Sequence, residues 1–140
     1  KKFEDAISCC NKIIDLSDQK GILNITYDNK GLALSRLGKF TEALECHKKS
    51  FELNGKDKVN FVNTSMALGG LGRHEEAIEN CEKALEIDPN YAKAWNNKGY
   101  SLYKLGKAEE GLKDVEKALE LDSTDEDALE SKQEIIAALG

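Results

Sequence analysis

Proline and histidine are scarce in this sequence, which has one proline and two histidines among 140 residues. No run of about 18 apolar residues occurs, so the sequence predicts no membrane-spanning helix, and it contains no signal-peptide pattern. Its four cysteines lack the dense spacing of a disulfide framework in a small secreted domain. We therefore expect reduced thiols and a cytoplasmic location.

Positive charge is also in short supply. The 20 lysines and arginines are outnumbered by 26 aspartates and glutamates, which leaves a formal net charge of -6. Sequence-independent binding to DNA or RNA needs a basic face that displaces counterions from phosphates, and an anionic membrane surface makes the same demand. We therefore expect neither nucleic acid nor a membrane as a partner.

Catalytic and cofactor-binding motifs are absent from the sequence. There is no glycine-rich phosphate loop, no Gly-x-Ser-x-Gly elbow, no His-Glu-x-x-His pair and no Cys-x-x-Cys pair. The nearest feature, GGLG from Gly69 to Gly72, follows no strand, and we interpret it as a loose helix terminus that opens room. The sequence thus predicts a protein that is not an enzyme and binds no cofactor.

An internal repeat dominates what the sequence does contain. The segments LGKF, LGRH and LGKA begin at Leu37, Leu71 and Leu105, which is a period of 34 residues. Within each unit the apolar residues recur at spacings of three and four, as is typical of amphipathic helices, so each unit predicts two helices. The first helices are expected at 24–37, 58–71, 92–105 and 126–138, and the second helices at 3–16, 40–53, 74–87 and 108–121.

The repeat predicts an all-α fold of about eight helices in a single array over residues 1–140. A helix pair cannot bury its apolar stripe alone, so neighbouring pairs must stack. The half repeat is offset by 37 residues, which predicts three extra residues in the turn around Gly21. The array would comprise a half repeat at 1–23, full units at 24–57, 58–91 and 92–125, and a terminal helix that caps the array at 126–140.

Breaks between the predicted helices are marked by glycine and proline. Gly38, Gly72 and Gly106 are expected to end first helices in the left-handed conformation. Pro89, in the segment from Asp88 to Asn90, is expected to stop a second helix, because it has no backbone N–H and clashes with the preceding turn.

The stretch from Asn90 to Asp122 resembles a tetratricopeptide repeat. Positions of that pattern are occupied by Ala77, Pro89, Trp95, Gly99 and Leu102. The resemblance implies a right-handed α-α superhelix, a solenoid of antiparallel helix pairs whose first helices line the concave side. It also implies a noncatalytic protein-protein interaction scaffold that binds a peptide segment or a helix of a partner in the concave groove.

Concave side chains in this family come from the second, fifth, sixth, ninth, twelfth and thirteenth places of a unit. Asp28 stands at such a place, and Asn29, Asn63 and Asn97 recur at the repeat spacing, so their amides could bond an extended peptide backbone. Asparagine is also frequent at this place across the family, which leaves a purely structural role open. The peptide-binding residues that the resemblance implies are Asn29, Leu32, Arg36, Val59, Val62, Asn63, Met66, Lys93, Asn96, Asn97, Tyr100 and Lys104.

The resemblance also raises the carboxylate clamp that holds chaperone C-terminal tails. That clamp needs Lys and Asn on the first helix, Asn on the next, and Lys and Arg on the third, whereas this chain has Asp28, Leu32, Asn63, Lys93 and Asn97 at those places. Two of the five match, and the aspartate reverses a required charge. We therefore expect no dedicated clamp for Hsp70 or Hsp90 tails, but a groove with an apolar floor ringed by basic side chains.

Cys46 and His47 are adjacent and raise the question of a metal site. The repeat aligns His47 with Cys10 and Cys81, in a column that packs the second helix into the core. Neighbours on a helix point about 100° apart, so Cys46 and His47 cannot easily share one ion. We expect core thiols, a partly buried imidazole and no metal, with the Cys9 and Cys10 pair as the remaining candidate for metal or redox chemistry.

The first predicted helix has an apolar face wider than one neighbouring helix would cover. Phe3, Ile7, Cys10, Ile13 and Ile14 all lie on it. One interpretation is that the sequence is a fragment of a longer repeat protein. The alternative is a self-assembly module that stacks through this exposed helix, which would make the protein a homo-oligomer.

Overall fold

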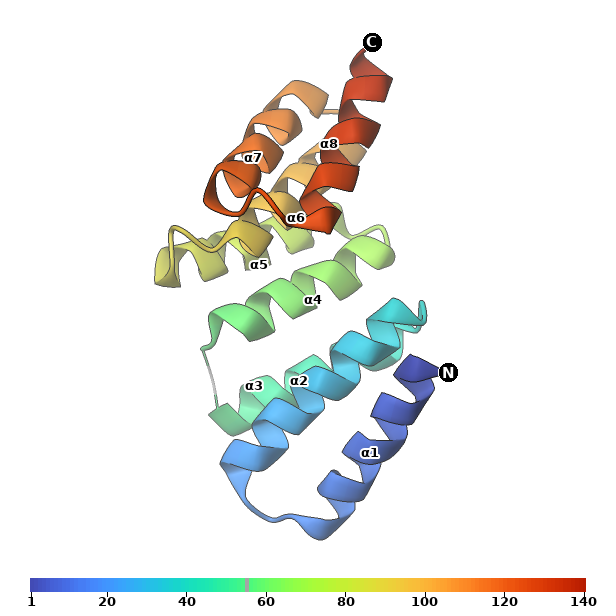
Figure 1. Cartoon of the computed structure of the whole chain (residues 1–140). Coiled ribbons are helices and arrows are strands. Elements are labelled where there is room, and N and C mark those ends of the chain that lie inside the picture. Colours follow the sequence, from blue (N-terminus) through green and yellow to red (C-terminus); the bar gives the residue numbers. More distant parts are fainter. Residues whose placement is uncertain (55) are drawn as a thin grey trace.

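The computed structural model describes residues 1–54 and 56–140, and within them the chain forms eight α-helices and no strand (Figure 1). The all-α prediction with about eight helices is confirmed. None of these helices is long and apolar enough to cross a membrane. The helices are α1 (Lys2–Leu16), α2 (Lys20–Arg36), α3 (Phe40–Asn54), α4 (Lys58–Gly70), α5 (His74–Ile87), α6 (Ala92–Lys104), α7 (Ala108–Leu121) and α8 (Glu126–Leu139).

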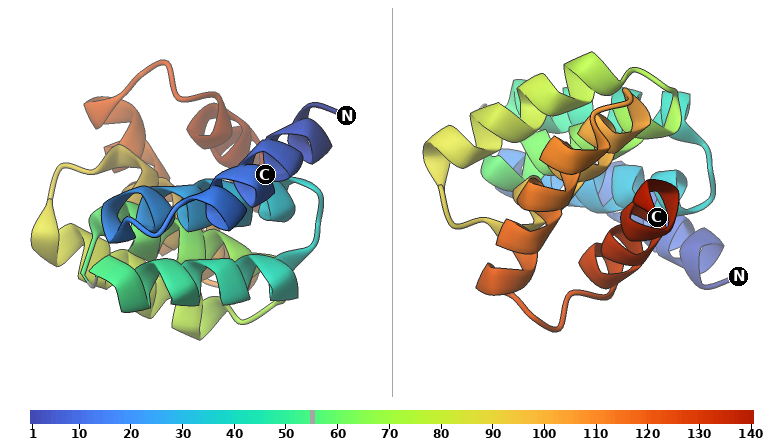
Figure 2. Two further views of the ribbon diagram at one scale, coloured as in Figure 1. Left: turned by 90° about the horizontal axis from the view of Figure 1, so that it is seen from below. Right: turned by 90° about the horizontal axis from the view of Figure 1, so that it is seen from above.

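The helices stack in pairs along one axis. Each helix packs against the next in the sequence, and α2, α4, α6 and α8 also contact one another in turn. Views from the two ends of the stack show each pair turned relative to the pair before it (Figure 2). The four even-numbered helices therefore form a continuous inner layer, which is the arrangement of a helical solenoid.

The helix ends follow the glycine and proline signals. Gly38, Gly72 and Gly106 have φ values of 77°, 77° and 88°, in the left-handed region. At the first of these ends the Lys39 N–H donates to the Leu34 carbonyl at 2.9 Å, and the same bond recurs at the other two. Helix α5 ends at Ile87, directly before the Asp88-Pro89 pair. These predictions are confirmed.

Helix α2 begins earlier than predicted. The sequence predicts that the segment around Gly21 lengthens the connection between the first two helices. In the structure this segment is helical and belongs to α2, and only residues 17–19 connect α1 to α2. The segment contains no proline, and the Leu23 N–H donates to the Gln19 carbonyl at 3.0 Å, so the helix forms here despite Gly21. The extra residues of the first unit therefore extend the helix.

Small residues set the distance between paired helices. A Cβ built on Gly99 would lie 2.5 Å from the Gly111 carbonyl oxygen, and one built on Gly111 would lie 2.4 Å from the Gly99 carbonyl oxygen. The corresponding Ala43 and Ala77 are fully buried in the earlier pairs. Helices α6 and α7 thus approach more closely than any side chain at either glycine would permit.

The cysteines lie mostly in the core. Cys10, Cys46 and Cys81 are buried, Cys9 is exposed, and all four thiols are free. Burial raises the pKa of Cys10 and Cys46, and it raises the pKa of Cys81 to about 12. Among the described residues, no group of three His, Cys, Asp or Glu side chains is placed to hold a metal ion.

Candidate peptide-binding groove

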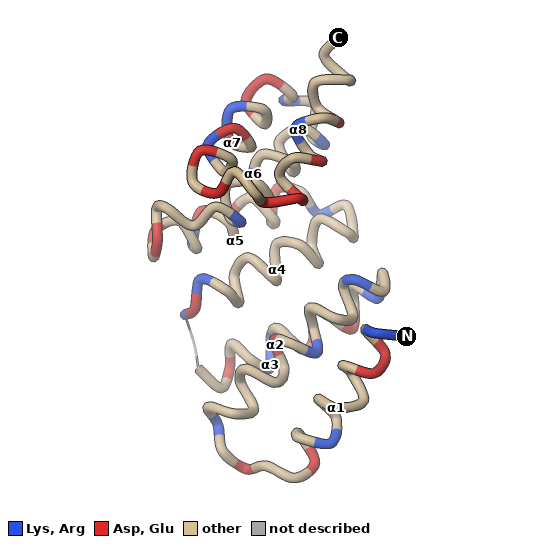
Figure 3. The backbone as a smooth tube through the Cα atoms, in the orientation of Figure 1, with Lys and Arg blue, Asp and Glu red and all other residues tan. Residues whose placement is uncertain are grey.

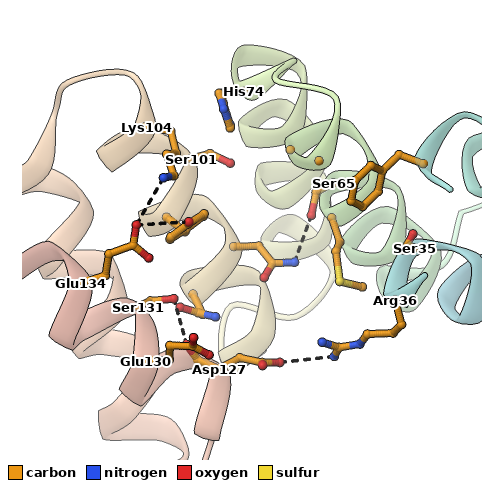
Figure 4. Close-up of a pocket in the computed structure, with 17 residues that line it drawn as sticks. Ser35, Arg36, Ser65, His74, Ser101, Lys104, Asp127, Glu130, Ser131 and Glu134 are labelled. Atoms are coloured by element: carbon orange, nitrogen blue, oxygen red, sulfur yellow. Dashed lines mark hydrogen bonds and ion pairs between the residues drawn. The ribbon is translucent and has the colours of Figure 1, made fainter. Parts of the chain in front are cut away.

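A cavity of about 570 Å³ opens on the inner face of the array (Figure 4). Its walls come from α2, α4, α6 and α8, with Phe40 of α3 and His74 of α5 closing one side. Helix α4 carries no charged residue after its first, so the middle of the inner layer is neutral (Figure 3). A groove crossed by four successive helices offers the length needed for an extended peptide or a helix.

The two glycines at the end of α4 have different surroundings. A Cβ on Gly70 would lie 2.4 Å from the Phe40 ring, whereas a Cβ on Gly69 would meet nothing within 4 Å. Both residues line the cavity. Gly70 therefore admits the aromatic ring to the wall of the groove, and Gly69 leaves open space, as the interpretation of GGLG anticipated.

Half of the predicted site residues border this cavity, and the other half do not. Met66 and Tyr100 are partly buried in its wall and supply apolar surface. The bordering residues are Arg36, Met66, Asn96, Asn97, Tyr100 and Lys104. The predicted residues outside its lining are Asn29, Leu32, Val59, Val62, Asn63 and Lys93.

Val62 and Asp28 do not lie on the concave surface. Val62 is only 3% exposed and packs with Phe61 and Ala84 in the core, so its predicted place is wrong. Asp28 is 6% exposed, and its Oδ1 lies 2.9 Å from His47 Nδ1 and 3.0 Å from Asn60 Nδ2. Both side chains point into the core, where side chains of neighbouring helices pack against them.

The three asparagines at the repeat spacing are not equivalent. Asn29 is exposed, Asn63 is buried, and Asn97 is partly buried. The Asn97 Nδ2 group already donates to Ser65 Oγ at 3.3 Å and to the Val62 carbonyl at 3.5 Å. The row therefore does not present three matching amides to one ligand.

Helix α8 supplies acidic groups to the groove. Arg36 Nη2 lies 3.4 Å from Asp127 Oδ2, and Lys104 Nζ lies 3.3 Å from Glu134 Oε1 (Figure 4). Hydrogen bonding to Tyr100, and to a smaller extent to Glu134, raises the pKa of Lys104. The predicted basic ring thus consists of two side chains, both paired to α8, while Lys93 lies outside the cavity lining.

Several buried polar atoms of the groove have no partner. Within the described residues, four buried side-chain polar atoms lack a hydrogen bond, and three of them belong to groove residues. These three are Ser35 Oγ, His74 Nδ1 and Asn96 Oδ1. Unpaired buried polar groups are rare in folded proteins and are commonly found where a ligand or water binds.

Models of repeat families match three parts of the chain. Two models described as tetratricopeptide repeat match residues 25–55 and 92–125, and one described as TPR repeat matches residues 70–106. Together these matches span more than half of the sequence. The chain belongs to the tetratricopeptide repeat (TPR) family.

Solved TPR domains share the fold. The first TPR of Spaghetti (RPAP3) bound to the HSP90 peptide SRMEEVD is 28% identical, with a TM-score of 0.71 over 83% of this chain and 92% of that one. The second TPR domain of human RPAP3, in complex with the HSP70 peptide SGPTIEEVD, is 26% identical, with a TM-score of 0.70 over 84% and 98%. MamA is similar in fold, at 19% identity and a TM-score of 0.74 over 99% and 79%. No curated protein matches the sequence.

The TPR register shows how the α8 residues could have been found. Asp127, Glu130 and Glu134 stand one 34-residue period after Lys93, Asn96 and Tyr100, at concave places of the family pattern. The sequence predicts that the last helix caps the array, and none of the predicted site residues lies on it. Because 126–138 is the first helix of a fourth unit, the family pattern already places these three residues on the concave side.

Proposed function

We propose that this TPR array is a noncatalytic interaction scaffold, in the cytoplasm, that captures a segment of a partner protein in its concave groove. The observation that carries the proposal is the cavity of about 570 Å³ lined by all four inner helices. Apolar surface from Met66 and Tyr100 lies there beside unpaired polar atoms, as in sites that bury side chains and orient a backbone. The peptide complexes of similar TPR domains agree with this use of the groove.

Selection from a peptide library tests the proposal. A phage-displayed library of random peptides is panned against the purified chain, and the enriched peptide is synthesised and titrated by fluorescence anisotropy. We expect the double variant M66A/Y100A to bind this peptide at least about tenfold more weakly, because two apolar anchors are lost. A selected peptide that binds the double variant as tightly as the native chain would remove the groove as the site.

The matched control is I87A. Ile87 is 49% exposed and lies on α5, outside the cavity lining. Its truncation also removes apolar surface, but we expect unchanged peptide affinity. Circular dichroism of both variants must show native helix content.

A second candidate function is self-assembly through α1. Exposed apolar side chains gather at the first helix pair, where Leu16 is 88% exposed and Ile25 is 63% exposed. If copies of the chain associate there, sedimentation velocity will show a concentration-dependent shift that L16K/I25K abolishes. A monomer at every concentration would eliminate this candidate.

A further inference from the structure

The charge of the groove is decided by α8. Its carboxylates Asp127, Glu130 and Glu134 border the cavity, whereas the lysine and arginine side chains there are Arg36 and Lys104. Among the described residues, the other titratable side chains of the lining are His74 and Tyr100. Carboxylates therefore outnumber the permanent cations.

The two cations are already paired. Arg36 is held by Asp127 at 3.4 Å and Lys104 by Glu134 at 3.3 Å. The Lys104 ammonium also lies 5.1 Å from the centroid of the Tyr100 ring. An incoming carboxylate would compete with an α8 carboxylate for either cation.

Glu130, unlike the two cations, has no charged partner among the described residues. Among the described residues it takes part in no ion pair and no side-chain hydrogen bond, and it is exposed at the edge of the cavity (Figure 4). Asn96, which stands one repeat period earlier on α6, is only 5% exposed, and its Oδ1 has no partner. The unpaired Glu130 carboxylate and the buried Asn96 amide oxygen, on adjacent inner helices, can both accept from a hydrogen-bond donor.

We propose that the groove takes a peptide segment with a lysine or arginine side chain, whose cationic group lies between Glu130 and the Asn96 amide oxygen. This inference rests on the proposed function of the groove. Lysine and arginine side chains offer several donors and no acceptor, so they suit a site of carboxylate and amide oxygens. An acidic segment would face a lining with one more carboxylate than lysine and arginine side chains, and the unpaired carboxylate is Glu130, which disfavours it.

The acidic tails bound by similar TPR domains are the competing occupants. In this chain the first inner helix offers them no free cation at the places of the family's clamp, because Asp28 is buried against His47 and Leu32 is apolar. The charge pattern therefore favours a basic segment over an acidic one.

Four synthetic peptide pools test the charge preference. The pools share randomised uncharged flanks and differ only at the central residue, which is Lys, Arg, Ala or Glu; SRMEEVD serves as a defined acidic peptide. Fluorescence anisotropy with the full chain measures the affinity at low and at high salt. We expect the Lys or the Arg pool to bind about tenfold more tightly than the Ala pool, and the Glu pool and SRMEEVD to bind most weakly.

Variants of Glu130 test whether this residue causes the preference for basic peptides. E130Q should remove most of the advantage of the basic pool while leaving the Ala pool unchanged, and E130K should reverse the order of the Lys and Glu pools. The control is E86Q, because Glu86 is exposed on α5 outside the cavity and its loss changes the net charge equally. A general effect of net charge would appear in both variants.

The outcomes separate the two proposals. If all pools bind alike, or if E130Q keeps the basic preference, the charge inference is wrong while peptide capture stands. Tightest binding of the Glu pool or of SRMEEVD overturns the inference in favour of an acidic segment. If no pool binds, the charge inference fails, and the peptide selected by panning decides peptide capture separately.

Discussion

His47 Nδ1 lies 2.9 Å from Asp28 Oδ1, and both side chains are buried. The pair links α3 to α2, and Asn60 of α4 joins it by donating to Asp28 Oδ1 at 3.0 Å and to the His47 carbonyl at 2.9 Å. Three helices from two adjacent repeats therefore meet in one buried polar network. The His47 Nε2 atom has no hydrogen-bond partner among the described residues, so the network is satisfied only in part.

Removal of the Asp28 carboxylate should destabilise the array. In D28A the His47 ring and the Asn60 amide lose their shared acceptor, and we expect a loss of about 2 kcal/mol in the free energy of unfolding, measured by urea titration. D28N keeps one acceptor oxygen and should lose less. Asp15 is exposed near the end of α1, so D15A should change stability by no more than about 0.5 kcal/mol. Equal stabilities of D28A and D15A would contradict a stabilising role for the network.

The His47 ring also limits what residue 31 can be. A Cβ on Gly31 would lie 2.5 Å from His47 Cε1, and the ring is held by Asp28. We expect G31A to lower the unfolding free energy by about 2 kcal/mol, because the network must shift to admit one methyl group.

Gly69 provides the comparison for this substitution. It lies in a helix with open space around its Cβ position, so G69A should be neutral or raise stability by up to about 1 kcal/mol. Thermal melts of the two variants decide the point, and a similar shift in both would show that helix propensity outweighs the contact with the ring.

Asp114 predicts an unusual pH dependence. Burial raises its pKa, although Lys98 Nζ lies 3.9 Å from its Oδ2 and acts in the opposite direction. The folded state therefore holds the proton more tightly than the unfolded state, and ionisation of Asp114 opposes folding as the pH rises from the unfolded pKa through the folded one. D114N abolishes this titration. Its stability relative to the native chain should rise between pH 3 and pH 6 in parallel urea titrations; a fall would mean that the pair with Lys98 dominates.

Cysteine reactivity should follow burial. The Cys81 thiol, with a pKa of about 12, has almost no thiolate at neutral pH, whereas Cys9 is exposed. Iodoacetamide labelling followed by peptide mass spectrometry should modify Cys9 in the native protein and Cys81 only after addition of denaturant. Labelling of both at similar rates in the native state would show that α5 opens readily.

Only the structure shows that a small residue in one packing column lies against a larger side chain in another. Gly31 lies under the His47 ring, and a Cβ on Gly99 would lie 2.8 Å from Val115 Cγ2. In the intervening pair Ser65 lies close enough to Cys81 to act against the burial that raises the pKa of its thiol. The repeat alignment places each of these residues in its column, but it does not show which columns touch.

The sequence by itself determined the helices, their order and most of their ends, because a 34-residue period, apolar spacing and left-handed glycines act over short stretches of chain. Only the tertiary structure decided which inner residues share one cavity. The turn between successive pairs brings Arg36 of α2 to Asp127 of α8 across 91 residues, and it turns Val62 and Asp28 into the core. Side-chain burial depends on neighbours from other repeats. The family's concave places within a single unit therefore predicted only some of the residues that line the groove.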